Sequence, residues 1–181
     1  KHVLLYFKNT AAQALAEEFN YAGRIENFDG DYLHINDTNL AGRKANWWVE
    51  EKVAKYTDKN GRTTLTIDYA NTGDYNAEWN TGYRDWVRVY VPQGATLLSS
   101  SGSLNQVLTG EDYGKTYFEG YLAVDPGGSI TFTLEYQLPK GLNAKNLLIQ
   151  KQPGTPAFEY SVKWDGKAEN LLLDKDSEID F

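Results

Sequence analysis

Acid–base and nucleophilic catalysis most often depend on histidine, and this chain of 181 residues has only two. His2 stands at the start of the chain, and His34 alternates with the apolar residues of a short predicted strand. Cysteine is absent, and the serines gather around Gly102 in an expected loop, without the nucleophile-elbow pattern. We therefore predict no catalytic residue and expect that the chain is not an enzyme.

Carboxylates are the second group that could do chemistry, since pairs of them hydrolyse glycosides and clusters of them bind calcium. The adjacent pairs Glu17–Glu18 and Glu50–Glu51 do not suit hydrolysis, because one member of each pair points away from the other. Three oxygen-rich clusters lack a complete loop of alternating calcium ligands. They are Asp29-Gly30-Asp31, Asn36-Asp37, and Asp174 with Asp176. We expect turn and strand-end aspartates there, with no metal and no cofactor.

Aromatic residues, 14% of the chain, are the third group, and some are spaced for ligand binding. Trp79 and Tyr83 lie in or beside a polar loop, and Trp86 follows closely. Flat rings at such a position could stack on the apolar faces of sugars. Against this, Trp86 begins a predicted strand, and tyrosine-rich sandwiches use such rings for packing across strands. We favour packing, and keep Trp79, Tyr83 and Trp86 as the candidate ligand-binding residues.

The net charge of −7 disfavours nucleic acid and anionic membranes as partners, because both repel an acidic chain. Lysines are dispersed on expected solvated strand edges, as at Lys44, Lys52, Lys55 and Lys59. The longest apolar runs have about five residues, against roughly 20 for a membrane span, so we expect no membrane contact by this part of the protein. Methionine is absent even at position 1, which suggests a piece of a longer protein with any signal or anchor upstream.

Residues 1–45 are predicted to form a strand–helix–strand segment, packed on the main domain or continuous with it. His2 to Phe7 is an apolar run typical of a buried strand, and Asp31 to Asn36 predicts a second short strand. Between them, Thr10 and Gln13 have capping-box spacing, and Gly23 suits a helix end. The apolar face of this helix would consist of Ala11, Leu15, Phe19 and Ala22.

Residues 46–181 have apolar side chains at every second position in most segments, which predicts strands with one buried face. Leu65, Ile67 and Tyr69 form one such set, and the run from Ile130 to Leu138 is the clearest. Turn residues such as Asp165-Gly166 separate the segments. The pattern predicts a mainly β fold, an antiparallel β-sandwich of immunoglobulin-like type, with a partly closed barrel as the alternative.

Several stretches, in order and spread over most of the chain, carry a family pattern. They are His2 to Lys8, Gln13 to Leu15, Asp31 to Leu33, Asp37 to Asn46, Tyr83 to Pro92, Leu138-Pro139 and Leu148 to Thr155. Together they resemble the C-terminal region of the bacterial family called domain of unknown function 4012 (DUF4012). His34 and Asn36-Asp37 depart from a more apolar version of the strand in that family.

The resemblance implies an extracellular location at the bacterial cell surface, with an anchoring membrane segment upstream. It implies no activity and carries over no catalytic residue. We therefore expect a structural or binding domain of the cell envelope, with envelope proteins or glycans as partners. The alternative is an accessory domain of an envelope enzyme that processes cell-wall polymers or glycopolymers, with its active site upstream; a hydrolase in its own right is least favoured.

Overall fold

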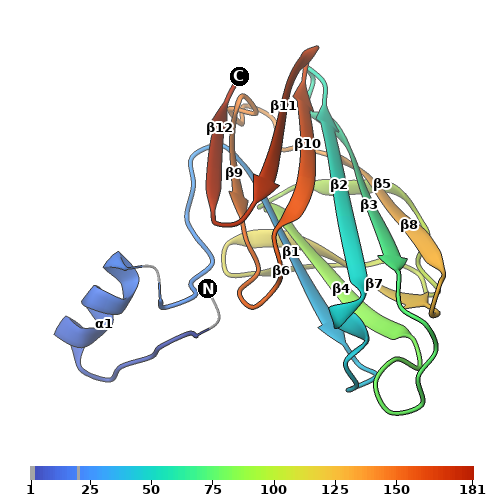
Figure 1. Cartoon of the computed structure of the whole chain (residues 1–181). Coiled ribbons are helices and arrows are strands. Elements are labelled where there is room, and N and C mark those ends of the chain that lie inside the picture. The colour runs from blue at the N-terminus through green and yellow to red at the C-terminus, as the bar shows by residue number, and fades with distance from the viewer. Residues whose placement is uncertain (1–2, 20) are drawn as a thin grey trace.

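The computed structural model describes residues 3–19 and 21–181. Two six-stranded sheets pack face to face, and one short α-helix lies beside them (Figure 1). The first sheet has the order β12-β9-β1-β4-β7-β6, and the second has the order β11-β10-β2-β3-β8-β5. The strands are β1 (Asp31–Asn39), β2 (Val49–Thr57), β3 (Arg62–Asn71), β4 (Tyr83–Pro92), β5 (Thr96–Ser101), β6 (Leu108–Asp112), β7 (Lys115–Val124), β8 (Ser129–Gln137), β9 (Asn146–Gln150), β10 (Phe158–Trp164), β11 (Lys167–Leu173) and β12 (Ser177–Asp180).

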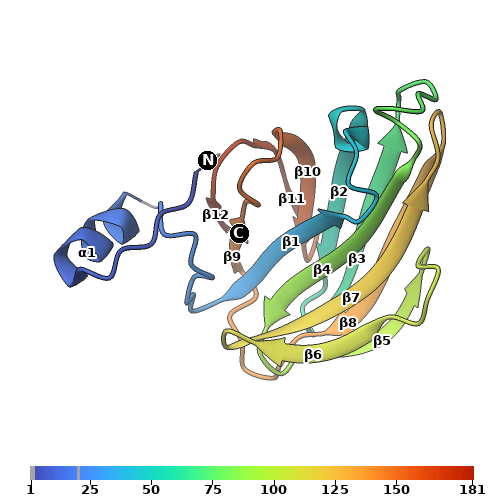
Figure 2. The ribbon, with the colours of Figure 1, turned by 90° about the horizontal axis from the view of Figure 1, so that it is seen from below.

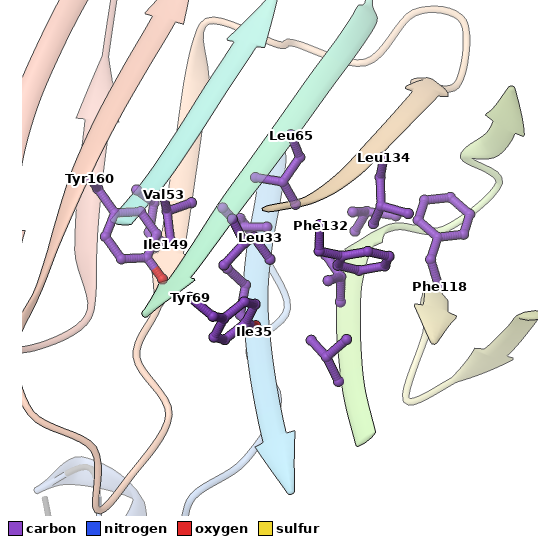
Figure 3. Close-up of a cluster of buried hydrophobic side chains, with 14 of the residues drawn as sticks. Leu33, Ile35, Val53, Leu65, Tyr69, Phe118, Phe132, Leu134, Ile149 and Tyr160 are labelled. Atoms are coloured by element: carbon purple, nitrogen blue, oxygen red, sulfur yellow. The ribbon is translucent and has the colours of Figure 1, made fainter. Parts of the chain in front are cut away.

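Alternating side chains of the two sheets build one apolar core (Figure 3). Leu65 and Tyr69 of β3 face Leu33 of β1 across the sandwich, and all three are fully buried. Burial of apolar surface stabilises such a core by roughly 25 cal/mol per Å². The predicted mainly β sandwich is therefore confirmed.

Both sheets are mixed, because each contains one parallel pair of strands. β9 runs parallel to β1 in the first sheet, and β10 runs parallel to β2 in the second. The remaining pairs are antiparallel. Side chains alternate with period two in either orientation, so the spacing of apolar residues does not distinguish them.

Two predicted turns or loops can be compared with the structure, one between β10 and β11 and one at β5. Asp165 and Gly166 have φ angles of 42° and 90°, the left-handed conformations of a tight hairpin between β10 and β11. The predicted serine loop is wrong in part, because Ser99 to Ser101 belong to β5. β5 pairs with β8 as an outer strand, where small polar side chains tolerate exposure to water.

The N-terminal segment contains the predicted helix but not the predicted first strand. Residues 3–7 pair with no strand, and His2 lies outside the described residues. A strand needs an open sheet edge, and β12 already covers the edge of β9. The helix α1 (Thr10–Glu18) is capped by Asn9, whose side chain accepts a hydrogen bond from the Ala12 amide at 3.0 Å, in place of the predicted capping box at Thr10.

The helix lies away from both sheets (Figure 1, Figure 2). Leu15 and Phe19 of the predicted apolar face are exposed, so this face does not pack on the sandwich. The second predicted strand is β1, which lies inside the first sheet between β9 and β4. In residues 3–19 and 21–181, no helix is long and apolar enough to cross a membrane.

Removal of residues 1–21 should leave the stability of the sandwich nearly unchanged. The hydrogen bonds that fasten the following segment to β9 remain, from the Glu26 amide to Gln150 Oε1 and from Gln150 Nε2 to the Arg24 carbonyl. We expect the melting temperature, measured by circular dichroism, to change by less than about 3 °C, which corresponds to about 1 kcal/mol for a chain of this size. A fall of more than about 10 °C would show that the helix supports the core.

Candidate functional site

One end of the sandwich, called the tip here, consists of residues 40–48, 72–82 and 125–128. Strand register brings these three connections together, because Asn39 lies opposite Asp85, Val49 lies opposite Asn71, and Tyr83 lies opposite Val124. The tip is at the lower end of the sandwich in Figure 1.

The structure separates the three candidate aromatic residues. Trp79 is exposed on the tip, but Tyr83 is buried in the core. Trp86 is half-buried on the other face of β4, where its ring centroid lies 6.3 Å from that of Tyr121. Alternation along β4 explains the difference, because Tyr83 and Trp86 are three positions apart, and residues an odd number of positions apart point to opposite faces. Tyr83 and Trp86 therefore pack against neighbouring residues on opposite faces of β4, and the three candidate rings do not share one surface.

Trp79 has a different aromatic partner, Trp47, which the candidate set lacked. Their ring centroids are 6.3 Å apart and their planes differ by 10°. Trp47 is 70% exposed and Trp79 is 44% exposed. The 3₁₀ turn η1 (Ala45–Trp47) buries Ala45 and leaves Trp47 in solvent. The sequence signal for Trp47 was the adjacent pair Trp47-Trp48 just before an alternating strand. Neighbouring residues in such a strand point to opposite faces, so one ring of the pair would be expected to face solvent.

Hydrogen bonds join the two long connections of the tip to each other. The Lys44 amide donates to the Trp79 carbonyl at 3.0 Å, and Arg43 Nη1 donates to the Ala77 carbonyl. The Lys44 ammonium lies 5.4 Å from the centroid of the Trp47 ring, within cation–π range. The two tryptophans are thus fixed relative to each other by backbone as well as ring contacts.

The 72–82 connection is also held internally. Asn76 Oδ1 accepts hydrogen bonds from the Glu78 amide at 2.9 Å and the Trp79 amide at 3.0 Å. The side-chain amides of Asn71 and Asn80 bond reciprocally at 3.0 Å, and both residues are buried. A surface held in this way loses little conformational entropy when a ligand binds.

A cluster of three carboxyl side chains lies behind the tip; two of them are buried, and that of Asp37 is half-buried. Asp37 of β1, Glu51 of β2 and Asp85 of β4 form this acidic cluster. Asp37 Oδ1 accepts a hydrogen bond from the Tyr69 hydroxyl at 2.7 Å, and Asp85 Oδ1 accepts one from the Thr38 amide at 2.7 Å.

Burial is the main reason why the cluster holds protons. It raises the pKa of Asp85 to about 9, and the negative charge of Asp37 adds to the effect. Burial also raises the pKa of Asp37 and, more strongly, that of Glu51. Burial therefore favours the protonated form of these three side chains in the folded protein.

A cavity of about 230 Å³ adjoins the acidic cluster and is bordered by Asp37, Glu51 and residues 152–156. The nearby Lys151 ammonium donates to the carbonyl and the hydroxyl of Thr155, each at 2.7 Å. Among the described residues, no three His, Cys, Asp or Glu side chains are grouped to hold a metal ion.

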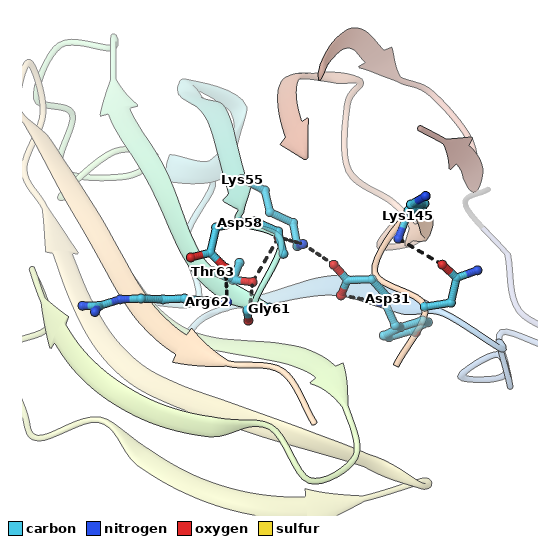
Figure 4. Close-up of polar contacts among 10 residues, drawn as sticks. Asp31, Lys55, Asp58, Gly61, Arg62, Thr63 and Lys145 are labelled. Atoms are coloured by element: carbon cyan, nitrogen blue, oxygen red, sulfur yellow. Dashed lines mark hydrogen bonds and ion pairs between the residues drawn. The ribbon is translucent and has the colours of Figure 1, made fainter. Parts of the chain in front are cut away.

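A buried ion pair lies near the opposite end of the core (Figure 4). Lys55 Nζ contacts Asp31 Oδ2, and both side chains are only 1% exposed. Lys55 also donates to Thr57 Oγ1 at 2.8 Å, and Asp31 Oδ1 accepts from the Tyr32 amide at 2.8 Å. The expectation of a solvated Lys55 is wrong, because β2 alternates strictly and position 55 faces the core.

His34 is packed among its neighbours in the first sheet. It is buried, its Nδ1 lies 2.9 Å from the Gln150 carbonyl oxygen, and its ring stacks on Tyr90 at 5.9 Å. Burial lowers its pKa below the usual range for histidine.

None of the protein-family models, curated proteins or solved structures with which the chain was compared matches it.

Proposed function

We propose that this chain is a non-catalytic extracellular domain of a membrane-anchored bacterial cell-envelope protein, and that it binds envelope proteins or glycans through its tip. The resemblance to the C-terminal region of the DUF4012 family supports the location and the upstream anchor. The stacked Trp47–Trp79 pair is the observation that carries the binding role.

Exposure of two tryptophans has no benefit for the core. Large aromatic side chains gain most from burial, and exposed apolar clusters on folded proteins commonly mark interaction surfaces. The hydrogen bonds from Lys44 to Trp79 and from Arg43 to Ala77 keep this costly surface in one arrangement. A preformed aromatic surface of this kind is typical of a binding site.

The path of the chain also favours a presenting role. β1 begins at Asp31, and its first residues pair with the start of β9, at the end opposite to the tip. The Phe181 amide donates to the Lys145 carbonyl at that same end. A segment that precedes β1 would therefore hold the sandwich with the tip directed away from it.

Retention of envelope material by the immobilised domain tests the proposal. We expect the wild-type domain to retain proteins or polymers from an envelope extract, and the double variant Trp47→Ala, Trp79→Ala to retain at least about tenfold less, the equivalent of 1.4 kcal/mol. Tyr113→Ala is the matched control, because Tyr113 is 67% exposed but lies at the opposite end, beyond the pairing of Lys115 with Pro92. Equal retention by wild type and double variant would refute a role for the tip.

An accessory domain of an envelope enzyme is the second candidate, since a projecting tip could also hold an upstream catalytic domain on its polymer. In that case the full-length protein should process cell-wall polymer, and the double variant should lose activity on insoluble polymer but keep activity on short soluble fragments. Equal losses on both substrates would contradict this role.

A further inference from the structure

The balance of charge on the tip restricts the chemistry of its ligand. The exposed charged residues of its two long connections are Arg43, Lys44, Asp74 and Glu78. Two are positive and two are negative, and Asp125 of the third connection is paired with Arg84 at 2.7 Å. With a net charge of −7 for the whole chain, the tip offers no attraction to an anionic polymer or an anionic membrane.

The aromatic surface favours flat, weakly polar partners. The π-face of a tryptophan carries partial negative charge and attracts the weakly positive C–H groups of a ligand that lies against it. One face of a sugar ring presents such C–H groups, while its edges carry hydroxyls. The parallel Trp47–Trp79 pair offers aromatic surface for this contact, and Trp47 is its more accessible member.

Polar residues lie close to the two tryptophans in the sequence. Lys44 and Asn46 precede Trp47, Glu78 precedes Trp79, and all three are exposed. Ammonium, amide and carboxylate groups together offer donors and acceptors, which suits hydroxyls that do both. A few such polar groups around an apolar surface fix the orientation of a ligand.

We infer that the tip binds a neutral polysaccharide, with a sugar ring stacked on Trp47 and with Trp79 positioning that ring from the side of the 72–82 connection. The inference rests on the proposed function and specifies its ligand class. Binding is insensitive to salt, because no net charge is neutralised on contact.

Titration calorimetry with defined probes tests the inference. The neutral probes are N-acetylchitohexaose, galactomannan and xylan; the anionic probes are polygalacturonate and vesicles of phosphatidylcholine with phosphatidylglycerol. We expect binding of at least one neutral probe with equal affinity at low and high salt. Trp47→Ala should weaken it by at least about tenfold. Trp47→Phe should retain part of the affinity, and Tyr113→Ala should retain all of it.

The supporting role of Trp79 has its own test. Trp79→Ala should weaken binding and change the near-ultraviolet circular dichroism of the Trp pair, whereas Trp79→Phe should recover most of the affinity. Unchanged melting temperatures would show that each variant is folded. Unchanged affinity of the Trp47→Ala variant, or binding of only the anionic probes, would overturn the inference.

The two proposals fail in different ways. If no neutral probe binds, but retention of envelope proteins still depends on Trp47 and Trp79, the glycan inference is wrong and the proposed binding function stands. If neither glycan nor envelope material is retained, both are wrong.

Discussion

Replacement of Lys55 by methionine should lower the free energy of unfolding by about 3–5 kcal/mol. The substitution keeps most of the apolar stem but leaves the Asp31 carboxylate without its partner, in a place where its side chain is 1% exposed. Breaking a buried ion pair from one side is strongly destabilising, because the remaining charge has lost its hydration without compensation. Urea unfolding at neutral pH, followed by circular dichroism, measures the change.

A double variant separates the effect of the lost charge from the effect of the changed side-chain shape. Lys55→Met combined with Asp31→Asn removes both charges and retains an acceptor for the Tyr32 amide, so we expect at least half of the lost stability to return. Lys52→Met is the matched control on the same strand, since Lys52 is exposed, and it should change stability by no more than about 0.5 kcal/mol. A loss below about 1 kcal/mol for Lys55→Met alone would contradict the assigned role of the pair.

The second large effect should appear as a loss of stability with rising pH. The pKa of Asp85 is about 9 in the folded protein, against an ordinary value of 3.8 for aspartate. Because the folded value is the higher one, this stabilisation is complete below about pH 4 and is lost as the pH rises through about 9. The slope in that range is at most about 1.4 kcal/mol per pH unit from this group.

Asp85→Asn should flatten this dependence and stabilise the protein above neutral pH. Asparagine resembles the protonated acid in shape, and its side-chain oxygen can still accept from the Thr38 amide. Urea unfolding at about pH 5, 7 and 9 compares the variant with wild type and with Glu169→Gln, a change at an exposed position of β11. If wild type is as stable at about pH 9 as at about pH 5, the acidic cluster does not hold its protons as described.

The alternation of apolar residues along the strands predicted the sandwich well. The same alternation also predicts which charged residues of these strands face inward, but it was not applied to them. Leu65, Ile67 and Tyr69 were assigned to the core on spacing alone, and all three are buried. The same spacing places Glu51 and Lys55 on the inner face of β2, although we predicted a solvated Lys55. Position in the strand determines their burial, and the Asp31 carboxylate across the sandwich compensates the charge of Lys55.

The binding surface was only partly predictable. Trp79 was a candidate because it lies in a polar loop, but its partner Trp47 is more than thirty positions away and meets it only through the pairing of β2 with β3. Tyr83 and Trp86 are also aromatic and lie close to Trp79 in the sequence. The alternation of side chains along β4 nevertheless places these two residues on opposite faces of the sheet. Pairwise distances across a sheet depend on register, which a single sequence specifies weakly.

The two parallel pairings have a consequence for how the chain is made. β1 and β2 leave the ribosome before their parallel neighbours, because each waits for a strand, β9 or β10, that is more than a hundred positions later. Until then both expose a row of unpaired amides and carbonyls, which invites association with other nascent chains. Such long-range pairing also slows folding, so completion of the sandwich should follow synthesis rather than accompany it.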